Sequence, residues 1–289
     1  MQASLLTNLL LPLALGIIML GLGLGLTLDD FRRVARYPRA VLIGLALQTL
    51  VLPWASFGLA LGFGLPAELA VGLMLLAASP GGATANIYSH LARGDVALNI
   101  TLTAINSLLC LLTLPVILNL SLEYFLGAGQ YVPPPTKKVI EVAAIILLPV
   151  AIGMVIRARA AGFAARTEKP IRLLSVLVLA LLVAAAVAQE WKTLTTYFAI
   201  VGLACLLFNL ASMGAGYAAP LALRLPKKQA IAIAMEIGIH NGTLAIFIAL
   251  NVLQNATISV PAAVYSLLMF VTAAVFAWWV SRAGRDAAG

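Results

Sequence analysis

The segment IAIAMEIGIHNGTLAIFIALNVL, residues 231–253, decides the fold of this chain. Glu236 carries the only formal charge in it, and a carboxylate at that depth of an apolar segment costs several kcal/mol unless something pairs with it. His240 and Asn241 follow within five residues, and two glycines interrupt the helix that the apolar residues predict. A polar, glycine-broken stretch inside a hydrophobic span is typical of a carrier's binding site.

The composition places the whole chain in a membrane. Of its 289 residues, 63% are hydrophobic and 10% are charged, whereas a soluble domain is roughly 45–50% apolar and about 25% charged. The N-terminus lacks the basic region of a secretory signal, so we expect the first apolar run to stay in the mature protein. Cys110 and Cys205 lie inside apolar runs and offer no disulfide or metal framework. The sequence therefore predicts an all-α polytopic integral membrane protein.

A membrane helix needs about 20 apolar residues. On that basis we predict spans at residues 5–28, 40–63, 67–92, 96–124, 137–157, 172–189, 193–222, 229–253 and 259–281. The connections between them are mostly short, and they leave no room for a soluble domain. Two of them, residues 29–39 and 157–172, are basic and amphipathic, which predicts helices that lie along the membrane surface.

The net charge of +8 does not indicate a nucleic-acid partner, because the basic residues sit in short loops between spans. With the C-terminus inside, 15 of the 18 lysines and arginines fall in inner loops. Such a bias orients membrane proteins, and it favours an N-terminus outside and a C-terminus in the cytoplasm. We expect a bacterial inner membrane as the location.

The third span is interrupted in its middle by Ser79-Pro80-Gly81-Gly82. Proline removes a backbone donor, and glycines lower the cost of unwinding. Unwound backbone at membrane depth is tolerated only where protein or a water-filled cavity surrounds it. A half-helix that begins near Ala83 would point free N–H groups at that cavity, which suits an anion, and Thr84 and Asn86 lie in its first turn. For this segment alone, the alternative is a plain proline kink or a hairpin between two shorter segments.

The two interrupted spans, the third and the eighth, are each followed by a long span that closes one half of the chain. Paired broken helices in corresponding places of two halves indicate an inverted-repeat carrier, although we count four spans before the midpoint and five after it. Other polar residues fit around the crossing: Gln48 in the second span, and a stripe of Asn99, Thr103 and Asn106 on the fourth. Their oxygens, with one carboxylate, are the ligands of a hard cation such as sodium.

The alternative for such polar residues is hydrogen bonding between helices, worth about 0.6 kcal/mol on average. We prefer that interpretation for Asn119 and Asn209, which have no motif around them. His240 stays ambiguous: it could pair with Glu236, accept a proton, donate to a substrate, or serve as a structural group.

Two motifs resemble those of a known family. SPGGATANIYSHLARGDVALNITLT, residues 79–103, resembles the first crossing-helix signature of the bile acid:sodium symporter family, and EIGIHNGTLA, residues 236–245, resembles the second. Residues 18–53 are similar to the family's early segment, so the likeness covers essentially the whole chain. It implies an inverted-repeat carrier with a panel domain, a core domain and two discontinuous crossing helices, here in a nine-helix member. The panel would be residues 1–39 and 125–192, and the core residues 40–124 and 193–289.

The resemblance also implies two sodium sites and a substrate site. One sodium site maps onto Asn86, Asn99, Thr103 and Glu236. The other maps onto Gln48, Glu236, the backbone of Ile237 and Ile239, and His240. The first turns of the two half-helices would face the substrate, at Thr84, Ala85, Asn241, Gly242 and Thr243. Ala85 stands where many members have serine, and His240 where they have glutamine. Because imidazole is a poor sodium ligand, a proton on His240 could replace the second sodium.

We therefore predict a secondary active transporter that couples Na⁺ to the symport of an organic anion, either a small carboxylate or a bile-acid-like molecule. A cation/proton antiporter that titrates Glu236 and His240 is the alternative. A membrane-embedded enzyme would need a nucleophile with a base or a metal cluster, and none is visible in the sequence, so we predict no enzymatic activity. The expected partners are the organic anion and the lipid bilayer; the oligomeric state stays open, with a monomer as one possibility.

Overall fold

The computed structural model describes residues 11–82, 84–127, 136–189 and 191–282, and this part of the chain is helical apart from turns, short connections and one isolated β-bridge. Each predicted span coincides with a helix or with an interrupted helix. These are α2 (Leu11–Gly25), α4 (Pro38–Ala46) with η3 (Leu47–Val51) and α5 (Leu52–Gly62), α6 (Ala67–Ala78) with α7 (Ala85–Leu91), α8 (Val96–Leu126), α9 (Thr136–Arg159), α10 (Ala161–Gln189), α11 (Trp191–Ala222), α12 (Lys227–Gly238) with α13 (Gly242–Phe247) and η4 (Ile248–Val252), and η5 (Thr257–Ser259) with α14 (Val260–Arg282). The first residues of the first predicted span lie outside the described part.

Among the described residues, four helices are long and apolar enough to cross a membrane by length and composition. They are Pro38–Gly62, Val96–Leu126, Phe198–Ala222 and Thr257–Arg282. Shorter apolar helices accompany them at Leu15–Gly25, Ala67–Ala78 and Gly242–Val252. The last two belong to the interrupted spans, whose breaks divide one crossing into two short pieces.

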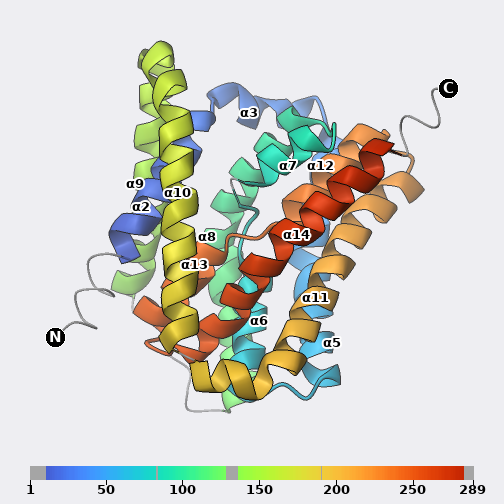
Figure 1. Cartoon of the computed structure of the whole chain (residues 1–289). Helices are drawn as coiled ribbons and strands as arrows, with labels where there is room; N and C mark the ends of the chain where they lie inside the picture. Colours follow the sequence, from blue (N-terminus) through green and yellow to red (C-terminus); the bar gives the residue numbers. More distant parts are fainter. Residues whose placement is uncertain (1–10, 83, 128–135, 190, 283–289) are drawn as a thin grey trace.

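One of the two predicted surface helices is present and the other is not. The first basic connection folds as α3 (Leu28–Arg32) and η2 (Arg33–Ala35), which run across the helix ends in Figure 1. The second prediction, at residues 157–172, is wrong. There α9 ends at Arg159 and α10 begins at Ala161, so most of the segment is the first part of a long helix. Its alanines and arginines are strong helix formers, so the segment after the reversal at Ala160 continues as the start of α10.

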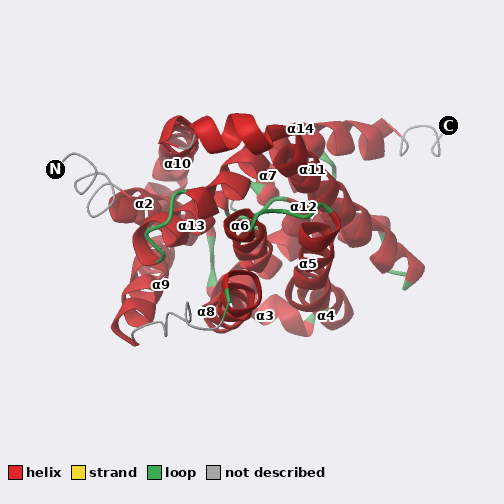
Figure 2. Cartoon of the chain, turned by 90° about the horizontal axis from the view of Figure 1, so that it is seen from below, coloured by secondary structure: helices red, strands yellow, loops and turns green. Residues whose placement is uncertain are grey.

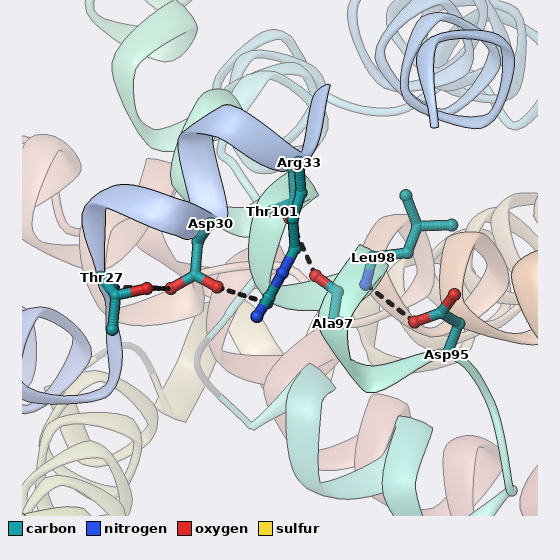
Figure 3. Close-up of polar contacts among 7 residues, drawn as sticks. All are labelled: Thr27, Asp30, Arg33, Asp95, Ala97, Leu98 and Thr101. Carbon is teal, nitrogen blue, oxygen red and sulfur yellow. Dashed lines mark hydrogen bonds and ion pairs between the residues drawn. The ribbon is translucent and has the colours of Figure 1, made fainter. Parts of the chain in front are cut away.

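A buried carboxylate fixes the start of α3. Asp30 accepts hydrogen bonds from the backbone N–H of Thr27 at 2.6 Å and from its hydroxyl at 2.8 Å. The other oxygen of Asp30 accepts from the Arg33 guanidinium at 2.6 Å, and Figure 3 shows these three side chains in line. Asp30 is only 3% exposed, so the pair with Arg33 supplies the partner that a buried charge requires. This cap holds the connection between α2 and α4 in one shape.

The two halves of the chain repeat the same elements 160 residues apart. Helix α12 begins and ends 160 residues after α6, and the span Phe198–Ala222 follows Pro38–Gly62 at the same spacing. The turns before α6 and α12 match as well, because Gly64 and Arg224 both adopt positive φ, at 57° and 61°. In Figure 1, α6 rises from the end of the molecule opposite to α3, whereas α12 starts at the same end as α3. The matched helices therefore run in opposite directions.

The start of α8 and its counterpart before α14 are capped in the same way. The Asp95 side chain accepts from the backbone N–H of Leu98 at 3.1 Å (Figure 3), and the Asn255 side chain accepts from Ile258 at 3.3 Å. Each cap also contacts the broken helix of the other half. The Asp95 N–H donates to the Lys228 carbonyl at 2.9 Å, while the Asn255 amide donates to Glu68 at 2.7 Å. The caps therefore tie the two halves together at both ends of the crossing.

We expect Asp95→Ala to lower the free energy of unfolding by about 1 kcal/mol, because it removes the N-cap of α8. The control is Asp29→Ala, which removes an exposed ion pair with Arg32 and should cost at most a few tenths of a kcal/mol. Thermal unfolding in detergent measures both variants. Equal losses for the two would show that the Asp95 cap contributes nothing beyond surface charge.

The helices form two groups. Helices α2, α9 and α10 pack on one another, and Figure 2 shows them at one side of the molecule. The interrupted helices α6–α7 and α12–α13 lie among α8, α11 and α14 in the other group. Helix α10 reaches across to α13 and α14, and α2 also contacts α13. The half-helix α13 is thus the part of the crossing that meets both groups.

Candidate functional site

The two interrupted helices cross at their breaks, as the sequence predicts. Helix α6 ends before the Ser-Pro-Gly-Gly segment, and α12 ends at its last glycine. The unwound segments between the half-helices pair with each other like two short antiparallel strands. The Gly82 N–H donates to the Ile239 carbonyl at 2.7 Å, and the Asn241 N–H donates to the Pro80 carbonyl at 2.8 Å. This pairing satisfies backbone groups that an apolar interior would otherwise leave without partners.

Glu236 lies at this crossing with no exposed surface. The Thr103 hydroxyl donates to its Oε2 at 2.5 Å, and the Asn106 amide donates to its Oε1 at 3.1 Å. Both partners come from α8, so the carboxylate joins α12 to α8. On its other side lies the break of α6, where a Cβ on Gly81 would overlap the Glu236 carboxyl group. Gly81 is therefore glycine because the carboxylate occupies the place of a side chain.

Besides that of Asn209 on α11, four side-chain amide oxygens near this crossing are buried and have no hydrogen-bond partner within the described chain. They belong to Gln48, Asn86, Asn99 and Asn106. The amide nitrogen of Asn99 donates to the Ala232 carbonyl at 2.7 Å, so its oxygen has to point the other way. A buried oxygen without a donor costs free energy, and a bound cation would satisfy several of them at once. Three of the four residues are on the predicted cation-ligand list.

The first predicted sodium site consists of Asn86, Asn99, Thr103 and Glu236, and two of these residues are in direct contact. Thr103 and Glu236 are hydrogen-bonded, and Asn99 lies one turn before Thr103 on α8. Asn86 is half-buried in the first turn of α7, which packs against α8 and α12. Of this set, Thr103 alone contacts the carboxylate directly, while Asn99 bonds to the Ala232 carbonyl one turn before Glu236. That donor set suits a hard monovalent or divalent cation.

In the second predicted sodium site, the side chains of Gln48 and His240 bond to backbone carbonyls rather than to Glu236. Gln48 donates its amide hydrogens to the carbonyls of Ala77 at 3.1 Å and Ser79 at 2.9 Å, at the end of α6. His240 Nδ1 lies 3.1 Å from the same Ser79 carbonyl, and because a carbonyl can only accept, this nitrogen carries a proton. No hydrogen bond joins His240 to Glu236 in the part that the structure describes. Gln48 and His240 thus meet at the break of α6.

The His240 ring is held by aromatic neighbours. It stacks on Phe208, with ring centroids 5.6 Å apart, and meets the edge of Tyr265 at 5.4 Å. The carbonyl of Ile239 accepts from Gly82, whereas the backbone of Ile237 lies in the last turn of α12. The Nε2 atom of His240 is buried without a partner among the described residues.

The predicted substrate residues lie at the starts of the two short half-helices. Asn241 is 8% exposed and caps α13 by accepting from the Leu244 N–H at 3.1 Å. Gly242 and Thr243 follow it and are buried, and Ala85 is fully buried in the first turn of α7. Thr84, the residue before α7, is half-buried. The two starts lie on either side of the paired segments, so all five residues border the crossing.

Two features of the site were not predicted. The first is that Asn106 bonds to Glu236; its spacing of seven residues from Asn99 placed it in the polar stripe, but the sequence alone did not single it out. The second is the π-helical turn η3 around Gln48; another such turn, η4, follows α13. Such turns are frequent at functional sites. Asn209, expected to make a helix–helix contact, donates to the Gly238 carbonyl at 2.8 Å and to the Tyr265 hydroxyl at 2.9 Å.

Two broken helices that cross around one buried carboxylate, with oxygen ligands beside it, define the class of protein: these features are typical of secondary transporters. Comparison with known proteins names the family. The profile described as "Sodium Bile acid symporter family" matches residues 12–197. The chain belongs to the sodium bile acid symporter family.

Relatives of known name support this assignment. The "Uncharacterized sodium-dependent transporter YocS" of Bacillus subtilis is 30% identical over 277 residues, which cover 95% of this chain and 84% of that protein. The "Probable sodium/metabolite cotransporter BASS2, chloroplastic" of Oryza sativa subsp. japonica is 28% identical over 94% of this chain and 64% of that protein. The mouse "P3 protein" is 30% identical over 78% of this chain and 47% of its own length.

Proposed function

We propose that this protein is a sodium-coupled symporter of an organic anion. The observation that carries the proposal is the buried Glu236 carboxylate, which α8 holds by two hydrogen bonds beside amide oxygens without partners. A cation bound there would neutralise the carboxylate and satisfy those oxygens. The names of two relatives, a sodium-dependent transporter and a sodium/metabolite cotransporter, agree with sodium as the transported cation. Membership in a family of symporters also speaks for transport rather than catalysis.

For the substrate we propose a small carboxylate, which would bind at the starts of α7 and α13. The N–H groups at a helix start carry partial positive charge and favour an anion. Thr84, Ala85, Asn241, Gly242 and Thr243 border that place. Cation and anion would then meet at one crossing, so that a bound sodium ion could raise the affinity for the substrate.

We further propose the division and orientation that the family implies. The panel would hold residues 1–39 and 125–192, and the core residues 40–124 and 193–289. The spacing of 160 residues between matched, oppositely directed helices supports an inverted repeat. Figure 1 also shows α3, the α7–α8, α9–α10 and α11–α12 connections, and the end of α14 at the same end of the molecule. These carry the basic residues, which supports a cytoplasmic location for that end in a bacterial inner membrane.

The proposal is tested by thermal unfolding of the purified protein in detergent. A ligand that binds only the folded state raises the unfolding temperature with its concentration. We expect sodium to raise it where potassium or N-methylglucamine at equal ionic strength does not. A panel of carboxylates should then add a further increase only when sodium is present. Stabilisation by protons or potassium alone, with no response to sodium, would favour the cation/proton antiporter.

We expect substrate to protect the crossing from a thiol reagent. Single cysteines at Thr84 and Thr243 should react more slowly when sodium and the carboxylate are bound, because both positions border the crossing. A cysteine at Asn119, a half-buried position on α8 sixteen residues beyond Thr103, should show no change. Both native cysteines are buried, so the unmodified protein gives the background. Protection of Thr243 without Thr84 would move the substrate site away from α7.

A second mechanism, in which a proton on His240 replaces one sodium ion, stays a proposal supported by the unpartnered Nε2. His240→Gln keeps a donor for the Ser79 carbonyl and removes the titrating group. Under this mechanism the variant should couple to more sodium than the wild type, and uptake should lose its pH dependence between about pH 5 and 8. Uptake into proteoliposomes across a pH series, at several sodium concentrations, measures both. Identical pH profiles for the two proteins would leave His240 with a structural role.

A further inference from the structure

The C-terminal end of α12 is held by two side chains from other helices. Gly238 is the last residue of α12, and its carbonyl accepts from the Asn209 amide at 2.8 Å and from the Tyr265 hydroxyl at 2.9 Å. The last four carbonyls of a helix have no partner within that helix, and an apolar interior supplies none. Asn209 on α11 and Tyr265 on α14 therefore cap α12 at the point where it breaks.

The Gly238 carbonyl and the two capping side chains form a closed triangle of hydrogen bonds. The Asn209 amide also donates to the Tyr265 hydroxyl at 2.9 Å, and neither side chain has exposed surface. The amide cannot be reversed, because its oxygen would then face the Gly238 carbonyl oxygen. A Cβ on Gly238 would overlap the side chain of Met213, one turn after Asn209 on α11. Hydrogen bonds and close packing thus set the end of α12 in one position against α11 and α14.

Two residues of the candidate site lie on either side of this cap. Glu236 is two residues before Gly238, and His240 is two residues after it. Helix α8 holds the Glu236 carboxylate by two hydrogen bonds, while α11 and α14 hold the backbone of the same helical turn. The Tyr265 ring also meets the His240 ring, with centroids 5.4 Å apart. Tyr265 therefore contacts both the cap and a side chain of the site.

The first half of the chain caps its broken helix in a corresponding way. The Gln48 amide donates to the carbonyls of Ala77 and Ser79 at the end of α6. At the 160-residue spacing, these carbonyls flank the counterpart of Gly238, and Gln48 corresponds to the residue immediately before Asn209. In each half, an amide from the preceding span thus caps the break. Asn209 takes the place in the second half that Gln48, a predicted site residue, has in the first.

We infer that Asn209 and Tyr265 are positioning residues of the Glu236 site. By holding the Gly238 carbonyl, they fix the last turn of α12 and so place the Glu236 carboxylate beside α8. The inference rests on the proposed sodium symport, and it adds two residues that act through the backbone of α12. A cap that only stabilised the fold would lower the free energy of unfolding and leave the sodium response unchanged. A positioning cap changes the sodium response itself.

The test removes each donor with little change of shape. Tyr265→Phe deletes the hydroxyl and keeps the ring against His240, and Asn209→Leu replaces the amide by an apolar side chain of similar size. In proteoliposomes, we expect half-maximal uptake in Tyr265→Phe to need about fivefold more sodium, the factor that corresponds to one lost hydrogen bond. Asn209→Leu should need at least as much. The rate at saturating sodium should stay near that of the wild type, because Glu236 and its partners on α8 are unchanged.

Matched controls make the same two changes away from Gly238. Tyr217→Phe alters a half-buried tyrosine two turns further along α11, and Asn119→Leu alters a half-buried position on α8. Both controls should keep the sodium dependence of the wild type. Thermal unfolding without sodium measures the structural cost of every variant separately, and unfolding with sodium should show a smaller stabilisation in Tyr265→Phe than in Tyr217→Phe.

The outcomes separate the inference from the symport. Lower stability with wild-type sodium dependence in Tyr265→Phe and Asn209→Leu would overturn the inference and leave the symport intact, because the cap would then be structural only. An equal loss of sodium affinity in the two controls would overturn it as well. If Asn209→Leu does not fold, the milder Tyr265→Phe decides. A wild type that ignores sodium would contradict the symport, and the inference with it.

Discussion

We expect Glu236→Gln to abolish sodium-driven uptake while the protein stays folded. A unit charge about 4 Å from a bound cation is worth about 4 kcal/mol at an effective dielectric constant of 20, which is roughly a thousandfold in sodium affinity. The amide can still accept from Asn106 through its oxygen, and its nitrogen can donate to the Thr103 hydroxyl, which also accepts. Both contacts of Glu236 to α8 therefore survive in altered form.

The measurement is sodium-dependent thermal unfolding together with uptake in proteoliposomes. Glu123→Gln is the matched control, because this carboxylate is exposed on α8, away from the crossing. The control should keep the sodium response of the wild type. Sodium-driven uptake of normal affinity in Glu236→Gln would remove Glu236 from the cation site, and the orphan amide oxygens would then need another explanation.

The second large effect is expected from Gly81→Ala. The new methyl group would overlap the Glu236 carboxyl group, so the carboxylate would have to turn away from Thr103 and Asn106. Overpacking of this kind costs about 1–3 kcal/mol of stability. We also expect uptake to fall to background, because the displaced carboxylate would no longer lie beside the amide oxygens.

Two other glycines serve as controls for Gly81→Ala. A Cβ on Gly58 in α5 meets no atom within 4 Å, so Gly58→Ala should leave uptake unchanged and raise stability slightly, by about 0.5–1 kcal/mol. A Cβ on Gly82 would lie 3.2 Å from the His240 carbonyl oxygen, and Gly82→Ala should have an intermediate effect. If Gly81→Ala transports normally, the contact between the α6 break and the Glu236 carboxylate does not matter for function. Transport assays on the three variants rank them directly.

The breaks in the two interrupted helices could be predicted from the local sequence. A regular helix through Pro80 and the two glycines after it, or through the two glycines that flank His240, would cost free energy. Both breaks can therefore be predicted from the sequence alone. Apolar length and the positions of the basic residues likewise predicted where each helix lies. The failure at residues 157–172 has a local cause, since a basic amphipathic stretch fits a surface helix and a helix extension equally well. Only the close reversal after Arg159 decides between them.

The side-chain contacts at the crossing could not be predicted from the sequence. It placed Gln48, Asn99, Thr103 and Glu236 in spans, but a hydrogen-bond partner 130 or more residues away, such as Asn106 for Glu236, depends on how the helices pack. The orientation of an amide also depends on its neighbours. The oxygens of Gln48 and Asn106 are left without donors because carbonyls and a carboxylate hold the nitrogens of the same two amides.

Sequence patterns were enough to predict the class of this protein, because the cost of polar groups and unwound backbone in lipid leaves few arrangements that a chain with these residues can adopt. They therefore predicted the spans, the two breaks and the single buried carboxylate between them. Tertiary structure alone decided the partners: Thr103 and Asn106 for Glu236, and Ser79, Phe208 and Tyr265 for His240. The physical reason is that hydrogen bonds and ring contacts act over a few ångströms, whereas the residues that make them here are far apart in the chain.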